Sequence, residues 1–530
     1  MDITTYYTFT IFILFIILSC WLFYRNFVKQ KESTLLTAFT FILALSSSFI
    51  LILFIPIDIY LTSNGKLDIS ILELKQKTIT KFYHFMFWVL ICQAYVLVPF
   101  SYFYIQNKSL YKNEFDDNIS VCENVIESFG KMIYFIIFLV VLSIIGLIYR
   151  PYQKIAMTKG KELEYIVDLL DIKHAGESAI LFLMGCVMLI GVSFWVTYTS
   201  HGLACLPLAF LHHENLEQCK KEIEDRFNRL KEKEMLIKSK YTPQNEIKQN
   251  DKNEIVKIEK MKKILSKYNY KLQEKEKIYE SWLSYVLGLV FTFRIIIGII
   301  FLTFSFTIYI SLLSSIVDKF FNSICAYNCG FVLDQINTIF NLLDSLLMFF
   351  SKFFPMDLFA IASLAIYIFC CSLYGIINVG ISVFFIPIFK IKRKNTPPKT
   401  LLVVCFVFIH IILVSMMTLL TIAPNYTTYG IQKIKINDNM GYMKCSLQTN
   451  KKGCRMSVLS VFFNKIFFGI PYLANSYFFS NWFFIIMCTF SFVYHLFFKK
   501  ISYFDKIDNF DFSNQNFEEE TNLLQLETLT

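Results

Sequence analysis

Long apolar stretches alternate with short polar ones along most of the 530 residues of this chain. An α-helix needs about 20 apolar residues to cross the hydrocarbon core of a bilayer, and nine stretches come close to that length or exceed it. They lie at 6–24, 35–56, 82–105, 132–149, 179–199, 284–316, 358–385, 401–423 and 477–498. The pattern predicts an all-α polytopic membrane protein with about nine transmembrane helices.

The composition agrees with a bilayer environment. Hydrophobic residues make up 55% of the chain and charged residues only 17%, whereas a soluble protein carries about a quarter charged residues. The net charge of +10 lies in inter-helix loops and in one long hydrophilic segment. Since Lys and Arg accumulate on the cytoplasmic side of membrane proteins, this charge indicates orientation, and no nucleic-acid partner is expected.

The basic loops predict the topology. No basic residue precedes the first apolar stretch, and Arg25, Lys29 and Lys31 follow it, which is typical of a retained helix with its N-terminus outside the cytosol. Nine spans then place both "KIKRKNTPPK" from Lys390 and the basic segment 220–283 in the cytosol. We therefore expect a lumenal N-terminus and a cytosolic C-terminus.

One soluble element divides the spans into residues 1–210 and 282–498. Between them, residues 211–281 carry two apolar stripes at sevenfold spacing, interrupted by the proline of "YTPQN". The stripe residues are Leu216, Ile223, Leu230, Ile237, Ile258, Leu265, Leu272 and Tyr279. This pattern predicts a cytosolic antiparallel helical hairpin, as a self-packed spacer or, less favoured, as a docking arm for a partner.

Three further segments complete the expected organisation. Residues 334–354 are apolar on one face but polar elsewhere, which favours an interfacial lumenal helix over a tenth span. Residues 424–476 form a lumenal loop, and residues 499–530 form an acidic cytosolic tail that we expect to be disordered.

The chain contains no motif of an enzyme active site. The phosphate-binding loop, the H-E-x-x-H helix and the G-x-S-x-G turn are all missing from the sequence. We expect no enzyme, no catalytic residue and no metal ligand. His201, His410 and His495 could bind a metal, but a histidine within a span is more often hydrogen-bonded between helices.

Arg294 is the one charge deep in the sixth apolar stretch. A charge at mid-membrane costs several kcal/mol unless it pairs or reaches water. Arg294 is thus an intramembrane functional charge if the helix begins well before it, or an interface anchor if the helix begins near Ile295. The anchor interpretation is slightly favoured.

The lumenal loops carry candidate covalent modifications. Cys325, Cys329, Cys445 and Cys454 all fall on the oxidising side, which predicts disulfides but leaves their pairing open. Asn425 in "NYT" is a glycosylation acceptor close to a helix end.

Two proline–aspartate stretches, "FIPIDIY" and "FFPMDLF", lie at the same predicted lumenal interface. The first ends the second span and carries Asp58, and the second begins the seventh span and carries Asp357. Asp357 stands where an N-cap carboxylate would accept free backbone N–H groups. An ion or substrate site shared by both aspartates is the less favoured alternative.

The tail holds a candidate sorting signal. Glu519, Leu523 and Leu524 form an E-x-x-x-L-L motif in "NFEEETNLLQLETLT". An exposed acidic dileucine motif binds clathrin adaptors that direct proteins to endosomes and lysosomes. The alternative is an acidic disordered tail without a signal.

Several stretches together resemble the limb-region membrane protein family. They are "LILFIPIDIYLTS", "VPFSYFYIQ", "TYTSHGLACLPL", "FFPMDLFAIA", "YGIINVGISVFFIPIFKIKRKNTPPKTLL" and "IAPNYTTYGIQ", in the order in which the family has them. The resemblance covers nearly the whole chain, and in the hydrophilic segment it rests mainly on "KIYESW".

This resemblance implies a lysosomal membrane protein that exports cobalamin (vitamin B12) together with an ABC half-transporter. Cobalamin would be the cargo, and the protein would carry no covalently bound cofactor. The resemblance identifies no cobalamin-binding residue. Cys445 and Cys454 fall where the family has a cysteine pair. The alternative is a plasma-membrane receptor or trafficking scaffold, like the lipocalin-interacting members of the same family.

Overall fold

The computed structural model contains two compact units. One comprises residues 1–206 and 303–530, and the other comprises residues 207–302. The structure describes residues 3–29, 32–63, 69–114, 120–148, 175–211, 216–241, 251–252, 254–263, 265–266, 269, 283–323, 339–353, 355–383, 386–389, 391, 396–435, 442–445 and 454–497.

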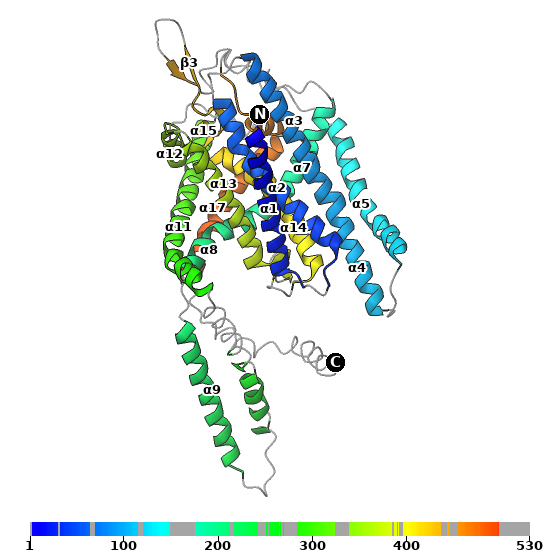
Figure 1. Cartoon of the computed structure of the whole chain (residues 1–530), viewed down its shortest axis with the longest axis vertical. Coiled ribbons are helices and arrows are strands. Elements are labelled where there is room, and N and C mark those ends of the chain that lie inside the picture. Colours follow the sequence, from blue (N-terminus) through cyan, green and yellow to red (C-terminus); the bar gives the residue numbers. More distant parts are fainter. Residues whose placement is uncertain are drawn as a thin grey trace. The chain divides into compact units, whose positions relative to one another are not determined.

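Helices dominate the described residues, as the sequence predicts (Figure 1). The α-helices are α1 (Ile3–Phe27), α2 (Leu35–Ser63), α3 (Ile69–Cys92), α4 (Val98–Glu114), α5 (Val121–Ile148), α7 (Ala175–Phe194), α8 (Ser200–Leu211), α9 (Leu216–Ser239), α11 (Leu283–Asn322), α12 (Leu342–Phe350), α13 (Met356–Val379), α14 (Pro398–Ile422), α15 (Pro424–Tyr429), α16 (Val458–Gly469) and α17 (Pro471–Phe497). Two π-helical turns, η2 (Gln93–Leu97) and η3 (Trp195–Thr199), join α3 to α4 and α7 to α8. Two antiparallel hairpins pair β1 (Ile381–Val383) with β2 (Ile386–Phe389) and β3 (Lys433–Lys435) with β4 (Tyr442–Lys444).

Within the described residues, eight helices are long and apolar enough to cross a membrane. They match eight of the nine predicted spans, and the remaining prediction, 6–24, falls on the 25-residue helix α1. The chain is therefore an all-α polytopic membrane protein, in which the four short strands are minor additions.

Helix α14 forms the core of the first unit and contacts α2, α4, α7 and α13. It carries no charged residue from Leu401 to Ile422, and nearly every side chain in it is buried. A helix that is apolar on all sides is stable where other helices surround it. Helix α5, in contrast, exposes many large apolar side chains, as expected of a lipid-facing helix.

Two glycines allow α8 to pack directly against α13. A Cβ atom at Gly202 would overlap the carbonyl oxygen of Cys371, and one at Gly375 would overlap that of Tyr198. Small residues at such crossings let helix backbones approach closely inside membranes. The motif "TYTSHGLACLPL" therefore includes a residue on which this packing depends.

Several span boundaries differ from the prediction, and two of the differences have a clear local cause. The seventh span was expected over 358–385, but α13 ends at Val379 because Gly380 adopts a φ of 76°, and the chain continues into β1. The second was expected to end at residue 56, but α2 runs on through Pro56 to Ser63. The helix tolerates this proline because one lost backbone hydrogen bond does not outweigh the burial of the turns that follow.

In the second unit, α9 lies beside a helical stretch within residues 251–266 (Figure 1). Ile223 and Ile237 of α9 and Ile258 and Leu265 of the second stretch are buried, and all four belong to the predicted stripes. Glu234 accepts hydrogen bonds from Lys238 at 2.5 Å and from Lys262 across the pair. Tyr241 donates to Asp251 at 2.5 Å near the turn.

Candidate functional site

The segment between α14 and α17, here called the α14–α17 connection, gathers buried polar contacts from distant parts of the chain. It comprises residues 423–470, of which α15, β3, β4 and α16 are described. Cys445 and Cys454 form a disulfide within it. The pairing that the sequence left open is thereby settled for these two cysteines.

Asp58 anchors the connection to α2. Its carboxylate is fully buried and accepts hydrogen bonds from the backbone N–H groups of Val458 at 3.3 Å and Leu459 at 3.0 Å. These are the first residues of α16, whose first turn has unpaired N–H groups and the positive end of the helix dipole. Asp58 thus caps a helix that lies 400 residues away in the sequence.

Asp344 of α12 does the same for α15. Its Oδ1 accepts from the Tyr426 N–H at 2.9 Å, and its Oδ2 accepts from the Asn425 side chain at 2.8 Å. Asn341 precedes α12 and donates to the carbonyl oxygen of Ile422 at 2.8 Å. The end of α14 and the start of α15 are therefore both held by α12.

Asp357 is not an N-cap, contrary to the sequence-based expectation. Pro355 occupies the cap position of α13, which has no side-chain cap hydrogen bond. Asp357 instead accepts a hydrogen bond from the Tyr426 hydroxyl at 2.9 Å. Burial, together with this nearby carboxylate, raises the pKa of Tyr426 above its usual value of 10, so the hydroxyl stays a donor.

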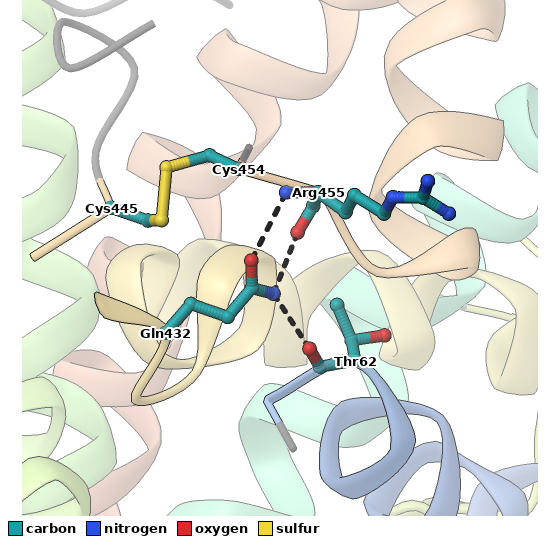
Figure 2. The surroundings of a disulfide bond; sticks show 5 residues. All are labelled: Thr62, Gln432, Cys445, Cys454 and Arg455. Atoms are coloured by element: carbon teal, nitrogen blue, oxygen red, sulfur yellow. Dashed lines mark hydrogen bonds between the residues drawn. A yellow bond between two sulfur atoms is a disulfide. The ribbon is translucent and has the colours of Figure 1, made fainter. Parts of the chain in front are cut away.

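Gln432 ties the disulfide region to the end of α2 (Figure 2). Its amide nitrogen donates to the carbonyl oxygens of Thr62 at 2.7 Å and Arg455 at 2.8 Å, and its amide oxygen accepts from the Arg455 N–H at 3.0 Å. Figure 2 shows the Arg455 guanidinium pointing away from this contact. The Gln432 side chain therefore pairs three backbone groups, two of which belong to Arg455, the residue after Cys454.

A small pocket lies beside these contacts. It is lined by Ser314, Ser315, Asp318, Lys319, Ile339, Asn341 and Pro424. Its empty space is about 240 Å³, part of which is open to solvent. Pockets for drug-sized ligands span about 300–1,000 Å³, and a corrinoid needs more, so this pocket does not enclose cobalamin.

Comparison with known proteins decides the family. The sequence profile described as LMBR1-like membrane protein matches residues 5–493. The chain belongs to this family. The resemblance inferred from its sequence motifs is thereby confirmed.

Named relatives are similar over almost their full length. The chain is 25% identical to the "Probable lysosomal cobalamin transporter" of Nematostella vectensis, over 96% of this chain and 97% of the relative. It is 26% identical to the "Lysosomal cobalamin transport escort protein LMBD1" of Bos taurus, over 95% and 94%. The protein of the same name from Danio rerio is 25% identical over 90% of each chain. No solved structure matches.

The two aspartates of this LMBR1-like protein have different partners. Asp58 binds the start of α16, and Asp357 binds Tyr426. Both oxygens of Asp58 accept backbone hydrogen bonds, which leaves this carboxylate poorly suited to an ion. The contacts therefore favour structural roles over the shared site that the sequence left as an alternative.

Arg294 contacts the end of another helix. Its Nε donates to the carbonyl oxygen of Phe210 at 3.1 Å, and its Nη2 donates to that of Ala209 at 2.8 Å. These carbonyls belong to the last turn of α8, where a cation is favoured by the helix dipole. Because α11 begins at Leu283, Arg294 lies well inside this helix and not at its start.

His410 is a hydrogen-bonded core residue. Its Nδ1 lies 2.7 Å from the carbonyl oxygen of Phe406, and its Nε2 lies 3.0 Å from the Tyr95 hydroxyl. The imidazole is completely buried in α14. Both ring nitrogens are paired, as expected of a histidine between packed helices.

Other predicted positions remain predictions. Cys325, Cys329, Glu519, Leu523 and Leu524 lie outside the described residues. Asn425 is exposed, but the nitrogen that would carry a glycan donates to Asp344.

Sequence reasoning missed Asp344, Tyr426 and Gln432 as residues that anchor the α14–α17 connection. Tyr426 and Gln432 stand in "IAPNYTTYGIQ", one of the stretches that carry the family resemblance, so a signal was present. This signal did not reveal which residues Tyr426 and Gln432 contact, because the contacting residues are 69 and 370 positions apart in the sequence.

Proposed function

We propose that this protein serves the export of cobalamin from the lysosome to the cytosol, as a multi-pass protein of the lysosomal membrane. The observation that carries the proposal is the end-to-end similarity to relatives named for lysosomal cobalamin transport. The match extends over 90% or more of each chain. The receptor alternative is not favoured, because the relatives described above are named for lysosomal cobalamin transport.

The energy for export would come from a partner. The chain contains no phosphate-binding loop, so it offers no recognised site for ATP hydrolysis. An ABC half-transporter would supply this step, and the protein would act as its escort and stabilising subunit. We expect no enzymatic activity of the chain itself.

Two features of the described residues in the first unit are consistent with an escort role. The central helix α14 is buried by side chains along nearly its whole length. The pocket beside Asn341 is too small for a corrinoid.

The disulfide supports a lumenal position for the α14–α17 connection. Disulfides persist in oxidising compartments and are rare in the cytosol. With this connection in the lumen, an odd number of spans places the N-terminus in the lumen and the tail in the cytosol.

The export role is tested in cells from which the endogenous relative has been deleted. Expression of this chain should return lysosomal free cobalamin to normal and restore the cytosolic and mitochondrial cobalamin cofactors. Cobalamin that stays in lysosomes despite correct localisation of the protein would refute the export role. Cross-linking to an ABC half-transporter in the same cells separates an escort from a lone transporter.

The candidate sorting signal is tested by mutation of the tail. Changing Leu523 and Leu524 to alanine should move a tagged protein from lysosomes to the cell surface, because adaptors bind the paired leucines. Leu526→Ala is the matched control in the same tail. Unchanged lysosomal staining of the double variant would show that adaptors do not use this motif.

A further inference from the structure

Three side chains with metal-ligating atoms converge at the contact between α8 and α17. His201 and Cys205 are one helical turn apart on α8, and His495 lies in the last turn of α17. One ligand atom from each residue lies within 4.8 Å of the other two. The His201 and His495 rings contact each other at a centroid distance of 5.0 Å.

The hydrogen bonds orient both imidazoles for a ligand. His495 Nδ1 lies 3.0 Å from the carbonyl oxygen of Ser491 and donates to it, which makes Nε2 the ring nitrogen with the lone pair. Asn378 Nδ2 lies 2.9 Å from His201 Nε2 and can only donate a hydrogen bond to it. His201 therefore also carries its lone pair on Nε2. The remaining His201 nitrogen, Nδ1, lies 3.3 Å from Ser491 Oγ. The two contacts of Ser491 at the Nδ1 atoms are of the kind that fixes the tautomer of metal-bound histidines. Asn378 would release His201 Nε2 when a metal binds there.

The spacing on α8 fits a tetrahedral ion. Cys205 Sγ lies 3.6 Å from His201 Nε2. With metal–sulfur and metal–nitrogen distances of about 2.3 and 2.0 Å, two tetrahedral ligands are about 3.6 Å apart. An adjustment of about 1 Å in the His495 side chain would bring its nitrogen to the same spacing.

We propose that His201, Cys205 and His495 bind a borderline-soft divalent transition metal ion, with Zn²⁺ as the best fit. Two imidazoles and a thiolate match the ligands that tetrahedral zinc prefers, and a fourth position remains for Asn378 or water. Cys205 is buried and the two histidines are half-buried, which shields the ion from bulk solvent without closing its access. The site is independent of the proposed function.

The ion would join two helices that are far apart in the sequence. His201 precedes Gly202, where α8 touches the backbone of α13, and Asn378 lies near the end of α13. Metal binding would thus hold α17 against the crossing of α8 and α13. The sequence alone favoured hydrogen-bonded histidines because it gave no reason to place residues 201 and 495 together.

The test uses the full-length protein, purified in detergent with a tag that contains no histidine, stripped of metal and titrated with Co²⁺ alone. We expect one Co²⁺ per chain, with the visible spectrum of a tetrahedral ion and a thiolate-to-cobalt charge-transfer band. Cys205→Ser should abolish the charge-transfer band, and His495→Gln should weaken binding at least about tenfold, since even the loss of an outer partner costs 10–100-fold. Zn²⁺ should displace the cobalt.

Matched controls are Cys405→Ser, another buried free cysteine, and His84→Gln, a histidine that packs against Phe462. Both should bind Co²⁺ as the unchanged chain does. A second readout needs no variant, because Zn²⁺ should slow alkylation of Cys205 in the unchanged protein, as measured by mass spectrometry of the labelled peptide. Absence of tetrahedral Co²⁺ binding in the unchanged protein, or binding that persists in Cys205→Ser and His495→Gln, would overturn the proposal.

Discussion

Asp58, Asp344 and Asp357 each direct a carboxylate at donors of the α14–α17 connection. Two of them accept backbone N–H groups at the start of a helix, and the third accepts the Tyr426 hydroxyl. An ionised acceptor at a helix N-terminus is stabilised by unpaired N–H groups and by the helix dipole. These contacts explain how acidic residues persist among apolar helices.

Removing the Asp58 carboxylate should destabilise the first unit. Asp58→Ala leaves two buried N–H groups of α16 without an acceptor, which should lower the free energy of unfolding by about 2–3 kcal/mol. Asp58→Asn keeps one acceptor oxygen and should lose roughly half as much. Thermal unfolding of the purified protein measures both, with the exposed Asp225→Ala as control. A melting temperature of Asp58→Ala equal to that of the control would contradict the capping role.

Helix packing depends on how closely two backbones approach, which a hydropathy pattern does not reveal. Gly202 and Gly375 bring α8 and α13 into backbone contact, and a hydrogen bond of 2.9 Å between Thr199 and Ser372 lies beside them. Pro99 changes the geometry of the helix in which it lies. Its ring would clash with the carbonyl of Tyr95 in a regular α-helix, and the chain adopts the π-helical turn η2 there. Local sequence and long-range packing thus shape neighbouring helices in different ways.

A side chain at Gly202 should separate α8 from α13. Gly202→Leu would place its Cβ against the Cys371 carbonyl, and we expect a loss of about 3 kcal/mol or more, seen as aggregation on size-exclusion chromatography. Gly130→Leu is the matched control, because nothing lies within 4 Å of its added Cβ. If both variants elute like the unchanged protein, the close crossing is not required for folding.

Acid should weaken the helix pair of the second unit only at very low pH. Hydrogen bonds from Lys238 and Lys262 lower the pKa of Glu234 to about 2 from its usual 4.5. A lowered pKa stabilises the folded form fully above pH 4.5, and this contribution is lost as the pH falls toward 2. The hydrogen-exchange protection factors of peptides covering 254–263, which correct for the intrinsic rate at each pH, should therefore stay high at pH 5 and fall below pH 4.

Glu234→Gln is the variant that isolates this effect. It should show faster exchange in the same peptides already at pH 7, and a smaller change on acidification. Glu224→Gln, an exposed residue of the same helix, is the control. Exchange in Glu234→Gln that matches the control at every pH would rule out a contribution of these ion pairs.

The molecule combines a helical membrane unit with an anchored connection at one end. Contacts of the α14–α17 connection reach α2, α12 and α13, and the disulfide lies next to the residue that Gln432 holds. A connection fixed at several points keeps the end of α14 beside the start of α17, although α15, β3, β4 and α16 lie between them in the chain.

Breaking the disulfide should shorten the lifetime of the whole protein. Cys445→Ser removes a cross-link, and native disulfides contribute about 2–5 kcal/mol in small secreted domains, with a smaller effect expected for a short loop. We expect a lower melting temperature and faster lysosomal turnover in a pulse–chase experiment. Cys20→Ser, at a free buried cysteine, is the control. Equal half-lives of the two variants would exclude this role of the disulfide.

The sequence alone determined the class and the family of this protein. Those properties are readable along the chain because the bilayer requires long uninterrupted apolar stretches, each of which forms its own backbone hydrogen bonds. Arg294 was recognised as unusual for the same reason, since a charge stands out in an apolar stretch.

Only the tertiary structure decided what the polar residues contact. Asp58 meets Leu459 across 401 positions, Gln432 meets Thr62 across 370, and His201 meets Ser491 across 290. Helices in a bilayer pack by shape and by hydrogen bonds between side chains, and lipid tails are as apolar as leucine, so hydrophobicity does not select which helices become neighbours. That choice depends on small residues such as Gly202 and on polar partners that are separated in the sequence and adjacent only after folding.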